Sequence, residues 1–252
     1  MRRLLLRICY DGTDFCGWQV QPNGITVQEC ICAALSDLLS EKVNVTGCSR
    51  TDSGVHADEF YCHFDTENIK IAPSGFVGAL NVRLPETISV LDCFEVPSDF
   101  HARYDALGKE YIYRMYHSRV RNPFYDKFAL QLPFAPDVDK ISKFCENLVG
   151  THDFAAFSAS GREYDTTVRT ITDCSFCENN GIYTLSVSGD GFLYNMVRII
   201  AGTALYVSEG KIEPDDVLEI LDKKDRSLAG PTAVAKGLTL HKVYYKRGLL
   251  NG

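Results

Sequence analysis

The residues best suited to do chemistry lie in one polar run, Ser49 to His56, where Arg50, Asp52 and Gly54 stand beside two hydroxyl side chains. A neighbouring arginine favours the charged form of an aspartate, so Asp52 suits work as a nucleophile or base better than as a proton donor. The same residues also suit a plain turn, because Asp and Gly adopt turn conformations easily. From local sequence, the catalytic carboxylate and the structural turn both stay open.

Two further segments, 100–104 and 109–116, mix aromatic side chains with cations. Proteins use this mixture to stack unpaired bases while neutralising phosphates. We expect Tyr111 and Tyr113 to share one face of a strand, although such alternation is also typical of an ordinary amphipathic strand. An RNA-binding surface and a plain strand are both compatible with this pattern.

Arg198 is the single cation in an otherwise apolar run that we expect to be helical from Phe192 to Ser208. A buried guanidinium needs a partner, and a loop carboxylate would be a suitable one. The alternative is that the long side chain reaches the surface. The run predicts an ion pair or a surface cation.

Composition narrows the class of protein. The chain has 252 residues and a formal charge of −7, with 45% hydrophobic residues, which is typical of a globular protein with a sizeable core. Its first apolar run is broken by Arg7, so we expect neither a signal peptide nor a membrane span. Among its ten cysteines only Cys174-x-x-Cys177 has a spacing seen in metal sites, and no second pair accompanies it. We therefore expect reduced thiols and a cytoplasmic setting. The acidic balance argues against a uniformly basic nucleic-acid surface and leaves a local one possible.

Periodicity predicts an α+β protein with two halves, residues 1–105 and 106–252. The first half would hold strands at 4–10, 42–48, 59–64 and 88–95 and helices at 26–40 and 72–82. The second would hold strands at 110–116, 167–177, 182–188 and 237–245, and helices at 137–149, 192–208 and from Pro214. Thr26 is the expected N-cap of the first helix.

The order of motifs along the whole chain resembles the TruA family of tRNA pseudouridine synthases. The matching segments, in chain order, are Tyr10-Asp11-Gly12, Gly17-Trp18-Gln19, Thr26-Val27-Gln28, Arg50-Thr51-Asp52-x-Gly54-Val55-His56-Ala57, Phe100-His101-Ala102-Arg103, Lys109-x-Tyr111-x-Tyr113, His152-Asp153-Phe154, Met196-Val197-Arg198 and Gly237-Leu238. Two positions depart from the family pattern: Ser49 replaces a glycine, and Asp58-Glu59-Phe60 replaces a segment with Gly-Gln.

The resemblance implies a pseudouridine synthase fold, in which two ferredoxin-like halves share a continuous, mainly antiparallel sheet with helices on one face. It implies isomerisation of uridine to pseudouridine in the anticodon stem-loop of tRNA, at tRNA positions 38–40, by a homodimer that needs no cofactor or metal. Asp52 would be the essential carboxylate and Arg198 its partner. Tyr111 would contact the base, and Arg50 would hold the nucleotide out of the stack.

Two other functions compete with this interpretation. A non-catalytic RNA-binding module would use the aromatic and cationic residues and would survive loss of Asp52, but no RNP1-like signature supports it. A glycosidase would need a second carboxylate in a comparable setting, and none is evident. A purely structural protein leaves the ordered motifs unexplained.

Overall fold

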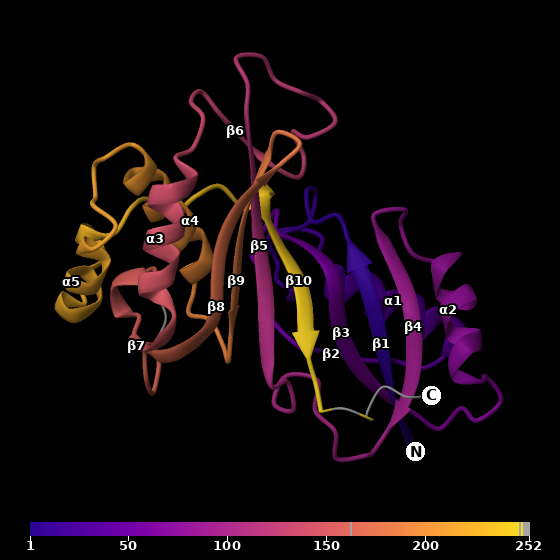
Figure 1. Ribbon diagram of the computed structural model, residues 1–252. Helices are drawn as coiled ribbons and strands as arrows, with labels where there is room; N and C mark the ends of the chain where they lie inside the picture. Colours follow the sequence, from indigo (N-terminus) through magenta and orange to yellow (C-terminus); the bar gives the residue numbers. More distant parts are fainter. Residues whose placement is uncertain (162, 247, 249–252) are drawn as a thin grey trace. The chain divides into compact units, whose positions relative to one another are not determined.

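The computed structural model describes residues 1–161, 163–246 and 248, which form two compact units (Figure 1). The first unit holds Met1–Leu107 and the C-terminal segment that begins at Leu240, and the second holds Gly108–Thr239. Each unit combines helices with a sheet, so the α+β class expected from the sequence is confirmed. None of the helices in the described part of the chain is long and apolar enough to span a membrane.

The first unit is built on a sheet with the strand order β4-β1-β3-β10, with the short β2 also paired to β3. These strands are β1 (Arg2–Tyr10), β2 (Thr46–Gly47), β3 (His56–Thr66), β4 (Ile88–Val96) and β10 (Leu238–Tyr244). The pairs β1–β3 and β1–β4 are antiparallel, with Leu4 opposite Phe64 and Glu95. The unit's helices are α1 (Val27–Leu39) and α2 (Pro73–Asn81), and α2 packs beside β4.

The core of this unit follows from the apolar periodicity of its helices and strands. Ile31 and Leu35 of α1 and Phe76 of α2 are fully buried, and the Phe76 ring contacts Phe64 of β3 edge to face at 5.6 Å between centroids. Thr26 caps α1 as predicted, because its Oγ1 accepts a hydrogen bond from the Glu29 N–H at 3.3 Å.

The second unit is built on a sheet with the order β5-β9-β8-β7. The strands are β5 (Gly108–His117), β6 (Leu130–Leu132), β7 (Gly150–Asp153), β8 (Val168–Asn179) and β9 (Ile182–Gly189). All these pairs are antiparallel except β6, which lies parallel to β5. The helices are α3 (Val138–Leu148), α4 (Met196–Ser208) and α5 (Asp216–Lys223), with 3-10 turns at Ala155–Phe157, Arg226–Leu228 and Ala235–Gly237. Helix α3 packs on β8 and against α4.

Helix α4 is approached very closely by the segment 229–233, because both surfaces carry a glycine at the contact. A Cβ on Gly202 would lie 1.7 Å from the Pro231 carbonyl oxygen, and one on Gly230 would lie 2.6 Å from the Gly202 backbone. The Gly230 N–H donates to Thr203 Oγ1 at 2.9 Å. This contact fixes the segment 229–233, which includes a hydrogen-bond partner of Arg198.

Two expectations about individual elements are wrong in their extent. Only Thr46 and Gly47 of the predicted strand 42–48 form a strand, since the Val43 N–H bonds to Ser36 Oγ and the Val45 carbonyl accepts from Gln28 Nε2. The predicted helix at 192–208 begins instead at Met196, because Asn195 has a left-handed backbone (φ 60°).

Candidate functional site

Asp52 lies in the loop that joins β2 to β3, and its neighbour Thr51 anchors that loop on both sides. The Thr51 hydroxyl is hydrogen-bonded to the Tyr10 hydroxyl at 2.8 Å, and its carbonyl oxygen accepts from the Trp18 N–H at 3.1 Å. Thr51 itself is buried. Thr51, the residue before Asp52, is therefore held by Tyr10 of the motif Tyr10-Asp11-Gly12 and by Trp18 of the motif Gly17-Trp18-Gln19.

Two glycines let the chain approach this loop more closely than any side chain would allow. A Cβ on Gly12 would lie 2.0 Å from the Val55 carbonyl oxygen, and one on Gly17 would lie 2.5 Å from the Thr51 carbonyl oxygen. Gly17 also has a φ of +82°, which favours glycine. The Gly12 N–H donates to Nδ1 of the buried His56 at 3.0 Å. Both glycines thus have a steric reason to be in the motifs.

The turn after Asp52 presents its carboxylate at a half-buried position. The Val55 N–H closes the turn on the Asp52 carbonyl at 3.2 Å, Gly54 supplies the positive φ of +76°, and the Ser53 hydroxyl donates to the Phe15 carbonyl at 3.1 Å. Arg50, two residues earlier, is exposed. The loop is an ordered turn as well as a candidate site, and it places a carboxylate and a guanidinium near the surface together.

Beneath the loop lies an aromatic cluster. Trp18 stacks on Phe60 with 4.1 Å between centroids, and Tyr10 contacts Phe60 at 5.7 Å. Trp18 also leaves no room for a side chain at Gly47, where a Cβ would lie 2.6 Å from the indole. Tyr10, Trp18 and Phe60 thus support the loop from below, a role that their places in the sequence motifs do not reveal.

In the second unit, Tyr111 and Tyr113 lie on β5, two residues apart. The Tyr111 ring is 7% exposed and meets Phe192 edge to face at 5.2 Å. Tyr113 is fully buried and donates its hydroxyl to the Val234 carbonyl at 2.8 Å. Burial raises the pKa of Tyr113, and the nearby positive charge of Arg198 opposes this rise. The charge of Arg198 therefore lies near β5.

Arg198 is anchored in the first turn of α4 by contacts that include the Ala233 carbonyl and Asn195. Its Nε donates to the Ala233 carbonyl at 2.7 Å, and one terminal nitrogen donates to Asn195 Oδ1 at 2.8 Å. The Ala233 N–H in turn donates to the Arg198 carbonyl at 3.0 Å. The side chain is half-buried and ordered, so it is not a mobile surface cation.

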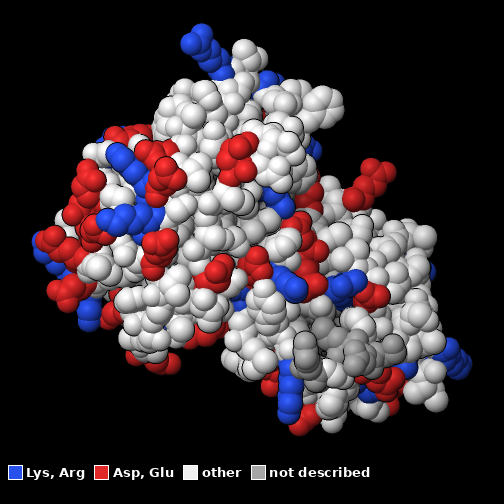
Figure 2. All heavy atoms as spheres, viewed as in Figure 1, with Lys and Arg blue, Asp and Glu red and all other residues white. Residues whose placement is uncertain are grey.

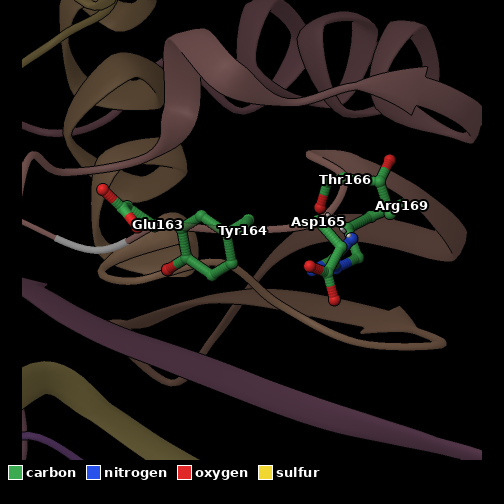
Figure 3. Close-up of a pocket in the computed structure, with 5 residues that line it drawn as sticks. All are labelled: Glu163, Tyr164, Asp165, Thr166 and Arg169. Carbon is green, nitrogen blue, oxygen red and sulfur yellow. Dashed lines mark hydrogen bonds between the residues drawn. The ribbon is translucent and has the colours of Figure 1, made fainter.

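A polar pocket lies beside the turn that leads into α4. Its volume is about 410 Å³, and Figure 3 shows its lining, with Tyr164 and Glu163 on one side and Asp165 beside Arg169 on the other. The Tyr164 hydroxyl accepts from the Tyr194 N–H at 2.7 Å, and the Ala159 N–H donates to the Tyr194 carbonyl at 3.0 Å. The segment that carries this pocket therefore braces the turn four residues before Arg198.

The remaining predicted features have local structural roles. The acids that replace the family's Gly-Gln segment have cationic neighbours: Asp58 contacts His241 Nδ1 at 2.9 Å and Glu59 lies 3.7 Å from Arg7. Cys174 is buried and Cys177 exposed on β8. His152 and Asp153 end β7 and Phe154 follows it; the Asp153 carboxylate accepts a hydrogen bond from the Thr167 hydroxyl and pairs with Lys224.

Of the four predicted site residues, the structure brings Arg50 and Asp52 together in one loop of the first unit. Tyr111 and Arg198 lie in the second unit, on β5 and at the start of α4. The first unit thus carries a loop with a carboxylate and a guanidinium, and the second unit carries a buried tyrosine on β5 and an anchored guanidinium on α4.

Comparison with known proteins identifies the chain's relatives. Residues 8–105 and 144–246 match the family described as tRNA pseudouridine synthase. The chain is 45% identical over 252 residues to tRNA pseudouridine synthase A of Exiguobacterium sibiricum, covering 99% of this chain and 100% of that protein. It is 42% identical over 245 residues to tRNA pseudouridine synthase A of Clostridium acetobutylicum, covering 97% and 100%.

A solved structure entitled Crystal Structure of a Cbf5-Nop10-Gar1 Complex matches with a TM-score of 0.33 and 13% identity, over 82% of this chain and 55% of that one. It is too distant to carry an argument. The sequence match covers most of both halves, including the Asp52 loop and Arg198. The chain belongs to the tRNA pseudouridine synthase family.

Proposed function

We propose that this chain, an isomerase of tRNA by its family, converts uridine to pseudouridine in the anticodon stem-loop at tRNA positions 38–40, with Asp52 as the essential carboxylate. The observation that carries the proposal is the construction of the Asp52 loop. Gly12 and Gly17 let neighbouring segments pack directly on its backbone, Thr51 anchors it, and Asp52 itself is half-buried, in a segment that matches the family.

The chemistry explains why so few residues suffice. The glycosidic bond from C1′ to N1 breaks, a new bond from C1′ to C5 forms, C5 loses its proton and N1 gains one, so product and substrate have the same atoms. A carboxylate can assist by adding to the nucleoside or by removing a proton. The role assigned to Asp52 is that of an essential carboxylate, without a choice between these routes.

A base inside a stem must leave the stack before a carboxylate can reach its sugar, which costs a few kcal/mol. Arg50 is exposed two residues before Asp52. Its guanidinium would help to keep the displaced nucleotide out of the base stack, for example by binding its phosphate. Tyr111, whose ring packs edge to face with Phe192, would contact the base. Arg198 would pair with Asp52 and keep it ionised.

The same proposal includes a homodimer in the cytoplasm. The dimer rests on the resemblance to the family. The cytoplasmic setting is supported by the substrate class and by the cysteines, all ten of which are free thiols.

The test is release of tritium from unmodified tRNA labelled at C5 of uridine, because C5 loses its hydrogen when it joins the sugar. Wild type should release tritium, with the product mapped to the anticodon stem-loop, and Asp52→Asn should release none. Asp58→Asn is a matched control, since it also removes one loop-proximal carboxylate, and it should retain activity.

Two outcomes would overturn parts of the proposal. Failure of the wild type to release tritium while it still binds tRNA would favour a binding module or another RNA substrate. Unchanged turnover in Arg50→Ala or Arg198→Ala, beside an inactive Asp52→Asn, would show that the arginines do not have the roles assigned to them.

A further inference from the structure

The loop between β5 and β6, residues 118–129, exposes apolar side chains that the proposed chemistry does not use. It projects from the end of β5 in the second unit (Figure 1). Phe124 is 86% exposed and Val120 75%, while Tyr125 and Phe128 are each 40% exposed. A group of exposed apolar side chains of this kind often indicates a binding surface.

The loop is ordered by its own hydrogen bonds. The Asn122 carbonyl accepts from the N–H groups of Tyr125 and Asp126, and the Asn122 side chain accepts from the Phe124 N–H at 3.0 Å. Tyr125 packs edge to face on Tyr116 at 5.5 Å. Phe124 is thus presented by a fixed turn, so that little order would have to be gained on binding.

Charge determines which partner fits this surface. Arg119, Arg121 and Lys127 are exposed in the same loop as the aromatic rings, and Lys236 contacts Asp126, the acid of the loop. Asp126 contacts Lys236 at 2.8 Å and Arg121 at 3.4 Å, and these contacts hold the pKa of Asp126 below its usual value. On the face shown in Figure 2, cationic side chains project where this loop lies, whereas cationic and acidic ones are mixed over α3 and α5. The loop is a cationic patch on a chain whose formal charge is −7.

We propose that the 118–129 loop is a second RNA-contact surface, which stacks an unpaired base of tRNA on Phe124 and neutralises adjacent phosphates with Arg119, Arg121 and Lys127. Aromatic rings framed by cations are the usual means of holding single-stranded RNA. A partner protein would match the exposed rings, but the excess of positive charge favours a polyanion. This inference rests on the proposed function, because it takes tRNA as the partner.

The experiment measures equilibrium binding of unmodified tRNA in an Asp52→Asn background, which keeps turnover out of the readout. Adding Phe124→Ala should weaken binding about tenfold, since loss of one stacked base has effects of this order. Replacing Arg119, Arg121 and Lys127 together by Gln should lower the slope of log affinity against log salt by about two to three. Turnover at saturating tRNA should be unchanged when Phe124→Ala is made in the wild-type chain.

Matched controls lie on α3 and α5. Leu218→Ala removes a half-exposed apolar side chain, and Lys143→Gln with Lys223→Gln removes two exposed charges. These variants should bind tRNA as the parent does. Equal binding by Phe124→Ala and by Leu218→Ala would overturn the inference.

The loop could instead bind a second copy of the chain, and sedimentation, which measures the oligomeric state, distinguishes this case. If Phe124→Ala changes the oligomeric state and leaves the tRNA affinity of each protomer intact, the loop is a protein interface and the inference is wrong. Failure of the proposed function looks different: wild type would release no tritium, whatever the effect of Phe124→Ala on tRNA binding.

Discussion

Replacing Gly202 by Ala tests how the structure holds Arg198. Gly202 lies in the middle of α4, where an added Cβ would stand 1.7 Å from the Pro231 carbonyl oxygen, against about 3.4 Å for an ordinary contact. The segment 229–233 would have to move away by well over 1 Å. That movement would stretch three hydrogen bonds: Gly230 N–H to Thr203 Oγ1, Ala233 N–H to the Arg198 carbonyl, and Arg198 Nε to the Ala233 carbonyl.

The magnitude follows from two opposing effects. Each weakened hydrogen bond costs about 0.5–1.5 kcal/mol, whereas Ala in a helix interior gains about 1 kcal/mol over Gly. The expected net loss is about 1–3 kcal/mol of the free energy of unfolding, which is the usual range for overpacking. Turnover should fall more than tRNA affinity, because the displaced segment carries a partner of the Arg198 side chain.

Gly78→Ala is the matched control. Gly78 also lies inside a helix, α2, but a Cβ there would meet nothing within 4 Å. This variant should gain about 0.5–1 kcal/mol. Urea unfolding followed by circular dichroism would measure both, and tritium release would measure turnover. A Gly202→Ala protein at least as stable as wild type would refute the reasoning.

Three further predictions concern stability and are checked by urea unfolding. Burial lowers the pKa of His63 from 6.5 to about 4. Between these pH values His63 is protonated in the unfolded chain but neutral in the folded chain. The free energy of unfolding should therefore fall by up to about 3 kcal/mol as the pH is lowered from 6.5 to 4. His63→Asn keeps the acceptor for the Ala102 N–H and should flatten this dependence; an unchanged pH profile would contradict it. The hydrogen bond from Thr167 and the ion pair with Lys224 lower the pKa of Asp153, so its contribution should be complete above about pH 4 and lost as pH falls through the lowered native value. Asp153→Asn should lower the free energy of unfolding by about 1 kcal/mol at pH 7 and by less at pH 3. An equal loss at both pH values would show that the negative charge of Asp153 does not contribute. Thr26→Ala should cost about 1 kcal/mol through loss of the α1 cap, with Thr26→Ser close to wild type.

Sequence reasoning predicted those elements of the fold whose apolar periodicity is strong. Helix α1 and its cap, α3 and the long strands lie within a few residues of their predicted limits. The failures occur where side chains replace strand pairing. Val43 and Val45 are buried as a strand would require, but Ser36 and Gln28 satisfy their backbone. No periodicity of the segment itself could reveal partners on another element.

The candidate site shows a similar limit. Residue types singled out Asp52, because an arginine and a glycine stand beside it, but they could not decide between a turn and a site. The structure shows that it is an ordered turn whose backbone is held by Gly12, Gly17 and Thr51. The roles of Tyr111, Arg50 and Arg198 stay proposals.

The fixed geometry of Arg198 affects the thermodynamics of its proposed pairing with Asp52. A free arginine side chain has about 2 kcal/mol of rotamer entropy to lose when it is immobilised. Here the Ala233 carbonyl and Asn195 immobilise it in the folded protein, so most of this loss occurs once, during folding, and would not recur when Arg198 pairs with Asp52. Lysine at position 198 would retain the charge but could not make both contacts in the same planar arrangement. Arg198→Lys should therefore pair with Asp52 at a larger entropic cost and turn over tRNA more slowly at constant charge, which tritium release would detect.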